Sequence, residues 1–243
     1  MWDFFFRALR HPFDYIGITR RHTLTLIEKT DLGQTAVLFR FKPERPLAWK
    51  AGQHGLFVFK GKKMEGNNWR PFSICSSTAD GTIDIATQIS ETPSQFKAAL
   101  NTLPVGGSFT MYGPYGEFHL HGNHTLIVGI AGGIGITPFL SMMQELAAGV
   151  HGEVTFHLIY AGKEGFYCFK KECDELMERA RNIHITYVSN RDDVTAAVDA
   201  AIKTHGNKAE YFISGSPGMI TGIGTTLKKA GIKRVVYDPF KAF

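Results

Sequence analysis

Residues 69–77 read Trp-Arg-Pro-Phe-Ser-Ile-Cys-Ser-Ser, and they place a cation, an aromatic ring and several hydroxyls on one short ribbon. Pro71 fixes its own φ and pushes Arg70 towards an extended conformation. Arg70 can grip a phosphate bidentately, Phe72 can lie against a flat ring, and Ser73 can hydrogen-bond a ring heteroatom. The stretch therefore suits a flat ligand that carries phosphate, although an ordinary strand of a β-barrel would also satisfy the pattern.

A second stretch, residues 125–140, reads Thr-Leu-Ile-Val-Gly-Ile-Ala-Gly-Gly-Ile-Gly-Ile-Thr-Pro-Phe-Leu. An apolar run leads into a glycine turn, which lets a backbone approach a pyrophosphate at a helix N-terminus. Thr137 is expected to be the N-cap of that helix and Pro138 its first residue. The glycines of the turn are Gly132, Gly133 and Gly135.

Four short motifs in this chain resemble those of the ferredoxin–NADP reductase family of flavin reductases, and they occur in the family's order. Arg70–Ser73 is similar to the family's Arg-x-Tyr-Ser flavin motif, with Phe in place of Tyr. Residues 133–138, Gly-Ile-Gly-Ile-Thr-Pro, are similar to its nicotinamide-binding loop. Residues 113–118 and 215–219 supply the other two matches. Each motif is weak alone, but the ordered set, spread over roughly residues 16 to 243, implies a protein that binds FAD and NAD(P)H.

The first half of the chain has the pattern of antiparallel strands. Residues 23–28 and 36–42 alternate apolar and polar side chains with period two. Asp80-Gly81 predicts a hairpin turn before a strand over residues 82–89. Many short strands with regular turns predict an antiparallel barrel. The resemblance implies a six-stranded Greek-key barrel that holds FAD, which we expect over residues 18–121.

From residue 125 onwards, apolar runs alternate with helical segments, which is typical of a parallel sheet with crossover helices. The apolar runs are residues 125–130, 154–160, 184–188, 211–214 and 235–237. We therefore expect a Rossmann-like α/β domain that binds NAD(P) over residues 122–243. The boundary is expected in a polar, histidine-rich link at residues 119–124.

Thr92 and Pro93 predict the start of a helix that runs to Leu100, with Thr92 as N-cap. The family places a Gly-x-x-Ser at this helix start to bind the pyrophosphate of the cofactor. Ser94 matches the Ser, and Glu91 stands where the Gly would be. An anion site at a helix N-terminus survives that change. The resemblance adds further cofactor-binding candidates, which are Pro71, Gln88, Ile89 and Gly113.

The ends of the other parallel strands should line the nicotinamide crevice. Ser189 and Arg191 follow one strand, and NADPH-selective members of the family hold the 2′-phosphate with a Ser and an Arg in this region. The pair therefore favours NADPH over NADH. A plain polar loop is the alternative, since Asp192 and Asp193 follow at once, and Lys163 is a second candidate cation.

The turn at residues 214–219 ends another strand, with Ser214 at a position where many family members have a Cys near the nicotinamide. Ser214 is therefore a candidate for a polar contact with the reacting ring, and Gly215 and Met219 for cofactor binding. Asp238 and Phe240 resemble the acid and the flavin-covering aromatic at the C-terminus of the family. The candidate catalytic residues are Ser73, Ser214 and Asp238.

Residues 1–17 form an aromatic N-terminal segment. A helix there would place Trp2, Phe5, Phe6, Leu9 and Phe13 on one face. We expect this face to pack on the body of the protein. The alternative is peripheral contact with a membrane through residues 1–13, with arginines near the lipid headgroups.

Bulk properties restrict the function further. The chain of 243 residues is long enough for two domains, and its net charge of +5 makes the surface basic without any run that favours nucleic acid. The three cysteines contain no Cys-x-x-Cys, which argues against a disulfide framework and an iron–sulfur site. We expect no metal and a reducing, cytoplasmic location.

The sequence therefore predicts a flavoprotein oxidoreductase. Hydride would pass from NAD(P)H to FAD, and electrons would pass on to an acidic carrier such as ferredoxin or flavodoxin. One alternative is a reductase of small acceptors such as free flavin or ferric chelates. Another is a non-catalytic electron-transfer subunit that docks to a larger complex or to a membrane complex.

Overall fold

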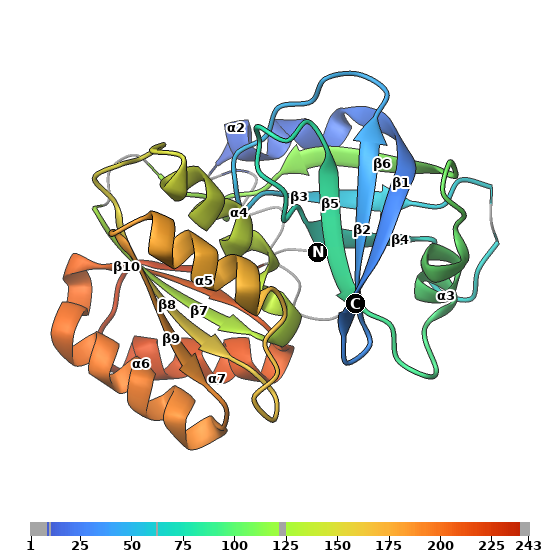
Figure 1. Ribbon diagram of the computed structural model, residues 1–243. Coiled ribbons are helices and arrows are strands. Elements are labelled where there is room, and N and C mark those ends of the chain that lie inside the picture. Colours follow the sequence, from blue (N-terminus) through green and yellow to red (C-terminus); the bar gives the residue numbers. More distant parts are fainter. Residues whose placement is uncertain (1–8, 10, 62, 122–124, 239–243) are drawn as a thin grey trace. The chain divides into compact units, whose positions relative to one another are not determined.

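The computed structural model describes residues 9, 11–61, 63–121 and 125–238. The chain divides into two compact units, the first of which ends at His119, while the second starts at Leu120 (Figure 1). Each unit is built around one sheet of its own. The expected change from an antiparallel to a parallel pattern is therefore confirmed.

The first unit is a curled sheet of six antiparallel strands in the order β4-β3-β6-β1-β2-β5. It confirms the predicted six-stranded barrel, and helix α3 (Gln95–Thr102) lies between β5 and β6 in the chain. The strands are β1 (Arg21–Gly33), β2 (Ala36–Pro43), β3 (His54–Val58), β4 (Trp69–Ser73), β5 (Ile83–Gln88) and β6 (Ser108–Tyr115).

Phenylalanine fills much of the core of the first unit, which explains part of the high phenylalanine content. Neighbouring rings lie 4.6 to 6.4 Å apart between centroids, in tilted, stacked and edge-on pairs that aromatic quadrupoles favour. The buried phenylalanines of this core are Phe39, Phe41, Phe57, Phe59, Phe72, Phe96 and Phe109.

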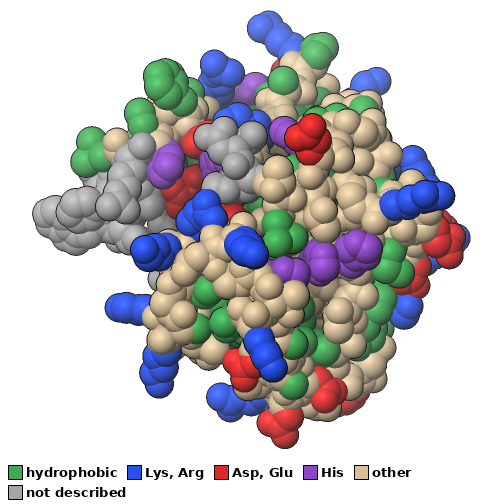
Figure 2. Space-filling model, turned by 90° about the vertical axis from the view of Figure 1, so that its left-hand side faces the viewer, with side chains coloured by type: hydrophobic (Ala, Val, Ile, Leu, Met, Phe, Trp, Pro, Cys, Tyr) green, Lys and Arg blue, Asp and Glu red, His purple; other side chains and the backbone are tan. Residues whose placement is uncertain are grey.

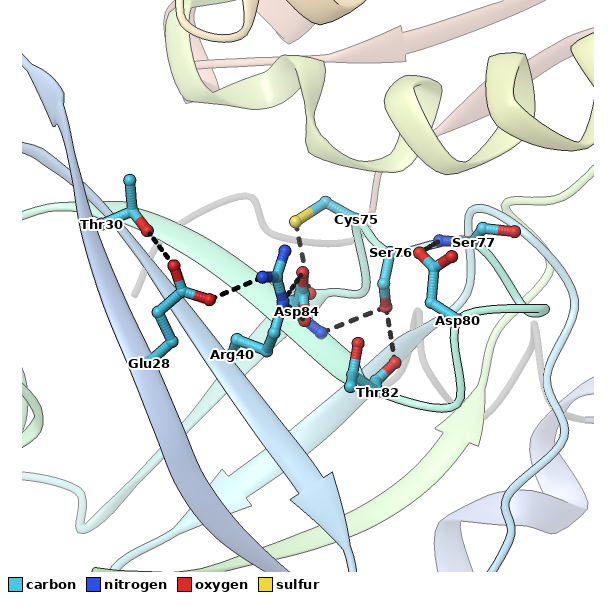
Figure 3. A network of polar contacts seen from close by, with 9 residues as sticks. All are labelled: Glu28, Thr30, Arg40, Cys75, Ser76, Ser77, Asp80, Thr82 and Asp84. Atoms are coloured by element: carbon cyan, nitrogen blue, oxygen red, sulfur yellow. Dashed lines mark hydrogen bonds and ion pairs between the residues drawn. The ribbon is translucent and has the colours of Figure 1, made fainter. Parts of the chain in front are cut away.

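The two edge strands, β4 and β5, are joined just beyond the end of β4 (Figure 3). The amide of Cys75 donates to the carbonyl of Asp84 at 2.9 Å, and the amide of Asp84 donates to Ser76 Oγ at 3.1 Å. Ser76 Oγ in turn donates to the carbonyl of Thr82 at 2.8 Å. These bonds satisfy buried polar groups at the sheet edges and fix the position of β4.

The side chain of Asp84 is buried at this junction and pairs with Arg40, whose Nε lies 3.0 Å from Asp84 Oδ2. The other end of the guanidinium reaches the more exposed Glu28, with Nη1 2.6 Å from Oε2 (Figure 3). Burial raises the pKa of Asp84 above its usual value, although Arg40 opposes the rise. Arg40 therefore favours the ionised form of Asp84.

The N-terminal segment of the first unit contains helix α2 (Pro12–Tyr15) and the 3-10 turn η1 (Ile16–Thr19). Asp14 Oδ1 lies 2.9 Å from Lys50 Nζ and 3.0 Å from His119 Nε2. Burial opposes ionisation of Asp14, but hydrogen bonds from Lys50 and His119 outweigh it and lower its pKa. His119, which was expected in the link between the domains, is the last residue of the first unit, and its side chain is buried in this cluster.

The expected packing of the aromatic face is also wrong for its described members. Phe13 is 88% exposed and Leu9 is 72% exposed, whereas Tyr15 is buried against Tyr115. The segment is held by the ion pairs of Asp14 and by the packing of the Tyr15 ring. With these two side chains directed inwards, the neighbouring Phe13 side chain faces solvent. Trp2, Phe5 and Phe6 lie outside the described residues.

The second unit is a five-stranded parallel sheet in the order β11-β10-β7-β8-β9, as predicted. Helices α4 and α5 cover one face, and α6 and α7 cover the other (Figure 1). The strands are β7 (Leu126–Gly132), β8 (Thr155–Ala161), β9 (Ile183–Val188), β10 (Glu210–Ser214) and β11 (Val235–Tyr237). The helical segments are η2 (Gly133–Ile136), α4 (Thr137–Ala147), α5 (Lys170–Arg179), α6 (Arg191–His205), η3 (Gly206–Lys208) and α7 (Pro217–Lys229).

Three histidines of the second unit lie together, with the ring of His157 tilted against His184 and edge-on to His205. The His157 ring centroid lies 4.8 Å from that of His184 and 4.9 Å from that of His205, and Figure 2 shows histidine side chains in a row on one face. Burial, and then the two neighbouring rings, lower the pKa of His157. Within the described ranges no group of three or more His, Cys, Asp or Glu side chains has the arrangement of a metal site.

All three cysteines, Cys75, Cys168 and Cys173, are buried free thiols. No helix in the described part of the chain is both long enough and apolar enough to cross a bilayer.

Arg40→Met should lower the free energy of unfolding at neutral pH by about 1.5–3 kcal/mol, because a buried carboxylate loses its charged hydrogen bond. The loss should shrink as the pH falls towards 3.8, the usual pKa of Asp84, because the raised pKa of the buried carboxyl means that it takes up its proton in the folded protein above that pH. Urea unfolding between acidic and neutral pH would measure it. Glu28→Gln, at the exposed end of the same network, should cost only about 0–1 kcal/mol. An equal loss in both variants would contradict the importance of the buried pair.

Candidate functional site

Strand β4 carries the predicted flavin motif along the edge of the first sheet. Ser73 is buried at the end of β4, and Pro71 is half-buried beside it. The ring of Phe72 packs edge-on against Phe57, 5.6 Å away, so a core contact also explains the aromatic at this position. Its expected contact with the flavin stays a prediction.

Arg70 lies beside the start of helix α3. Its Cζ stands 5.6 Å above the ring of Phe96, and its Nη1 donates to the carbonyls of Asn67 and Trp69. The guanidinium is therefore held by main-chain acceptors and an aromatic face, which leave its positive charge uncancelled.

Helix α3 begins later than its sequence predicts. Ser94, and not Thr92, is the N-cap, and its Oγ accepts from the amide of Lys97. Thr92 and Pro93 belong to the preceding turn, since the serine hydroxyl reaches the first turn of the helix and satisfies an amide there. The result places Ser94 at the helix N-terminus, as the pyrophosphate interpretation requires.

Sequence reasoning missed Lys97, which lies one turn into α3. Its Nζ donates to the carbonyl of Gln88 at 2.9 Å, and burial, together with the charge of Arg70, lowers its pKa. Neither Lys97 nor Arg70 forms an ion pair with a carboxylate among the described residues. The spacing Ser-x-x-Lys after a predicted N-cap was the only signal in the sequence. Two neighbouring cations without an acid provide a site for an anion with two charges.

The remaining candidates of the first unit lie at strand ends. Gln88 ends β5, and the amide of Ile89 donates to the carbonyl of Thr35. Gly113 has a φ of +124°, and a Cβ there would crowd the backbone of His54 and Gly55. The glycine thus lets two backbone segments pass close together.

The glycine turn of the second unit packs directly on the end of strand β10. A Cβ at Gly135 would overlap the carbonyl of Ser214 and the amide of Gly215, and one at Gly132 would overlap Met219 Sδ. Gly133 has a φ of +53° and faces open space. The structure therefore brings Gly132, Gly133, Gly135, Ser214, Gly215 and Met219 together at the carboxyl edge of the sheet, where ligands bind in such folds.

Thr137 does not cap helix α4, contrary to the prediction. The 3-10 turn η2 precedes the helix, Ile136 is the N-cap, and Thr137 is the first helical residue, with Pro138 second. The Thr137 hydroxyl instead donates back to the carbonyl of Ile134 at 3.1 Å. Both Thr137 and Pro138 are buried, and they pack directly after the glycine turn at the start of α4.

Ser214 and Asp238, two of the predicted catalytic residues, are in direct contact. Ser214 Oγ donates to Asp238 Oδ2 at 2.6 Å, and both side chains are buried. The amide of Asp238 also donates to the carbonyl of Ile213, which continues the sheet beyond β11. Phe240 lies outside the described residues.

Ser189 and Arg191 lie after β9, two strands away from the glycine turn. Both are exposed, and Arg191 is the first residue of helix α6, for which Asn190 is the N-cap. Asp192 and Asp193 occupy the same first turn, so the positive charge of Arg191 has acidic neighbours. Lys163 is exposed, and its Nζ lies 3.9 Å from Oε1 of Glu164.

Comparison with known proteins matches each unit to one domain family. The oxidoreductase FAD-binding domain matches residues 23–120, and the oxidoreductase NAD-binding domain matches residues 130–224. The NADH-cytochrome b5 reductase 1 of Dictyostelium discoideum is 28% identical over 173 residues, which cover 68% of this chain and 59% of the relative. The plasma membrane-associated coenzyme Q6 reductase of Saccharomyces cerevisiae is 29% identical over 174 residues, or 68% of this chain and 54% of the relative.

The fold also matches a solved structure over nearly its full length. The cytochrome b5 reductase domain of Ulva prolifera nitrate reductase superposes with a TM-score of 0.76 at 20% identity, covering 92% of this chain and 99% of that domain. This match concerns the fold alone.

Lys97→Ala should weaken FAD binding about tenfold or more, because a charge-assisted contact with phosphate is lost. Riboflavin, which has no phosphate, should bind the variant and the wild-type protein equally. Quenching of flavin fluorescence measures both affinities. Lys29→Ala is the matched control, since Lys29 Nζ also donates to a main-chain carbonyl, that of Asn101 near the C-terminal end of α3. Equal weakening of FAD and riboflavin would show that Lys97 does not contact the phosphates.

Proposed function

Because the chain belongs to the ferredoxin reductase-like family of flavoprotein oxidoreductases, with an FAD-binding domain followed by an NAD-binding domain, we propose that it oxidises NAD(P)H and passes the electrons to a separate acceptor. The flavin, when bound, accepts hydride and can release electrons singly or in pairs. The protein supplies binding, orientation and electrostatics.

The residues of the first unit fit the proposed FAD. Arg70 and Lys97 offer two cations without a carboxylate partner among the described residues, and Ser94 marks a helix N-terminus beside them. We infer that these three residues hold the pyrophosphate. Ser73 and the strand ends at Gln88 and Gly113 would contact the rest of the cofactor, as the family motif implies.

The second unit fits a nicotinamide nucleotide, and the observation that carries the proposal is the packing of its glycine turn. Gly135 has no room for a side chain because Ser214 and Gly215 lie against it, while Gly133 opens outwards. A turn so built presents main-chain amides to a pyrophosphate at low steric cost. The Ser214–Asp238 pair lies at the same edge of the sheet. We propose that it orients the nicotinamide ring for hydride transfer.

The acceptor is the finer part of the proposal. The matched segments span only 59% and 54% of the first two relatives, so the acceptors in those names belong to longer proteins. A net charge of +5 supports an acidic electron carrier of the ferredoxin or flavodoxin type. The three free thiols agree with the proposed reducing, cytoplasmic location. A second candidate is an acceptor that lies in a membrane or has an apolar docking surface. The exposed apolar side chains of Leu9, Phe13 and Ile16 on this chain support it.

Purified protein loaded with FAD should lose its flavin absorbance when NADPH is added without oxygen, and NADH should need a higher concentration. Arg191→Ala should weaken NADPH binding about tenfold, equivalent to about 1.4 kcal/mol, and spare NADH. Lys203→Ala, which removes an exposed cation in the last turn of the same helix, is the matched control. No bleaching by either nucleotide would refute the proposed oxidoreductase activity. Equal effects of Arg191→Ala on both nucleotides would show only that Arg191 does not bind the 2′-phosphate.

Electron transfer to an acidic carrier should slow steeply as salt rises, because screening shortens to about 10 Å at 0.1 M. Stopped-flow rates with ferredoxin as the acceptor, and with a neutral quinone as control, would measure the difference. A flat salt dependence would argue against an acidic carrier. A flat dependence together with slower transfer in Phe13→Ser would favour the apolar docking surface instead.

A further inference from the structure

Tyr160 is a fully buried residue of strand β8 whose hydroxyl joins two separate segments. Its OH lies 3.1 Å from the carbonyl oxygen of Gly133 and 2.9 Å from that of Cys168. Burial raises the pKa of Tyr160 far above its usual value, so the hydroxyl stays protonated and donates. One proton therefore serves two acceptors, and the hydroxyl binds both segments to the strand.

The two segments are distant in sequence, and one of them belongs to the proposed nucleotide site. Gly133 belongs to the glycine turn, and Cys168 ends the segment that follows β8 and carries Lys163. That segment is compact, since Lys163 and Phe166 form an antiparallel bridge.

The hydrogen bond from the Tyr160 hydroxyl to the carbonyl of Gly133 affects which main-chain groups of the glycine turn face a bound pyrophosphate. A carbonyl oxygen that pointed at a pyrophosphate would repel it, while an amide would attract it. Tyr160 draws the carbonyl of Gly133 towards β8, and the Thr137 hydroxyl draws that of Ile134 in the same manner. Two consecutive carbonyls of the turn are thus engaged by buried hydroxyls.

The ring of Tyr160 is held independently of its hydroxyl. It lies edge-on to Tyr167, with centroids 5.3 Å apart, and 6.1 Å from Tyr187. Replacement by Phe would preserve this aromatic packing and remove only the hydroxyl. The effect of the hydroxyl can therefore be measured separately from that of the ring.

We propose that Tyr160 is a positioning residue for the nicotinamide nucleotide, whose hydroxyl sets the carbonyl of Gly133 away from the pyrophosphate and ties the glycine turn to the segment before α5. The inference rests on the proposed function of the second unit. Tyr160 acts through the main chain and does not contact the reacting atoms.

Tyr160→Phe should weaken binding of ADP-ribose and of its 2′-phosphate about two- to tenfold, the range that one buried hydrogen bond supports. Calorimetry with these fragments, which lack nicotinamide, reports on the pyrophosphate site without turnover. The KM for NAD(P)H should rise by the same factor while kcat and the affinity for FAD stay unchanged. Hydrogen exchange should accelerate at the amides of residues 133–136.

Tyr211→Phe is the matched control. Tyr211 is equally buried, lies on strand β10 of the same sheet, and donates to the carbonyl of Ala201 at 3.3 Å, far from the glycine turn in sequence. The Tyr211→Phe variant should lose about as much thermal stability as Tyr160→Phe does. It should keep the wild-type affinity for ADP-ribose and for its 2′-phosphate.

Unchanged affinity in Tyr160→Phe, with normal binding by the wild-type protein, would overturn the role of Tyr160 alone. Equal weakening in Tyr160→Phe and Tyr211→Phe would also overturn it, since a general loss of stability would then explain both. Failure of the wild-type protein to bind either fragment would overturn the proposed nucleotide site and this inference with it.

Discussion

The hydrogen bonds that connect Cys75 and Ser76 to Asp84 are the constraint on which the first unit depends. They join the two edge strands of the curled sheet, and one of those strands, β4, carries Arg70 and Ser73. An edge strand without such bonds would leave main-chain groups unpaired and free to pair elsewhere. The flavin motif is therefore positioned by contacts that lie just beyond it in the chain.

In the second unit, close packing of the glycine turn depends on residues that have no side chain. Gly135 lies so close to Ser214 and Gly215 that only a hydrogen fits between the backbones. The buried hydroxyls of Thr137 and Tyr160 then fix the direction of the carbonyls in the turn. Glycines give the turn its close approach, and the hydroxyls below remove the freedom that glycines would otherwise leave.

Period-two alternation, apolar runs and glycine turns predicted both sheets, because these patterns follow from local geometry. Helix starts were less predictable, since Ser94 and Ile136 become caps through hydrogen bonds and a 3-10 turn that adjacent residues alone do not specify. The outward position of Phe13 depends on the anchor that Asp14 finds in Lys50, which is distant in sequence. Lys97 and Tyr160 gave no clear signal either, because an isolated helical lysine or strand tyrosine is ordinary.

The anion sites proposed for the two units rely on related arrangements. In the first, the cations of Arg70 and Lys97 have no carboxylate partner among the described residues, whereas Arg40 in the same sheet is neutralised by Asp84 and Glu28. Arg40 therefore serves the fold, while in the proposed FAD site the other two cations keep their charge. In the second unit, hydroxyls engage the carbonyls of the glycine turn, so its negative ends are already occupied. An anion site needs negative groups removed from it as much as it needs positive ones supplied, and in the proposed nucleotide site the buried hydroxyls beneath the glycine turn would meet the first of these needs.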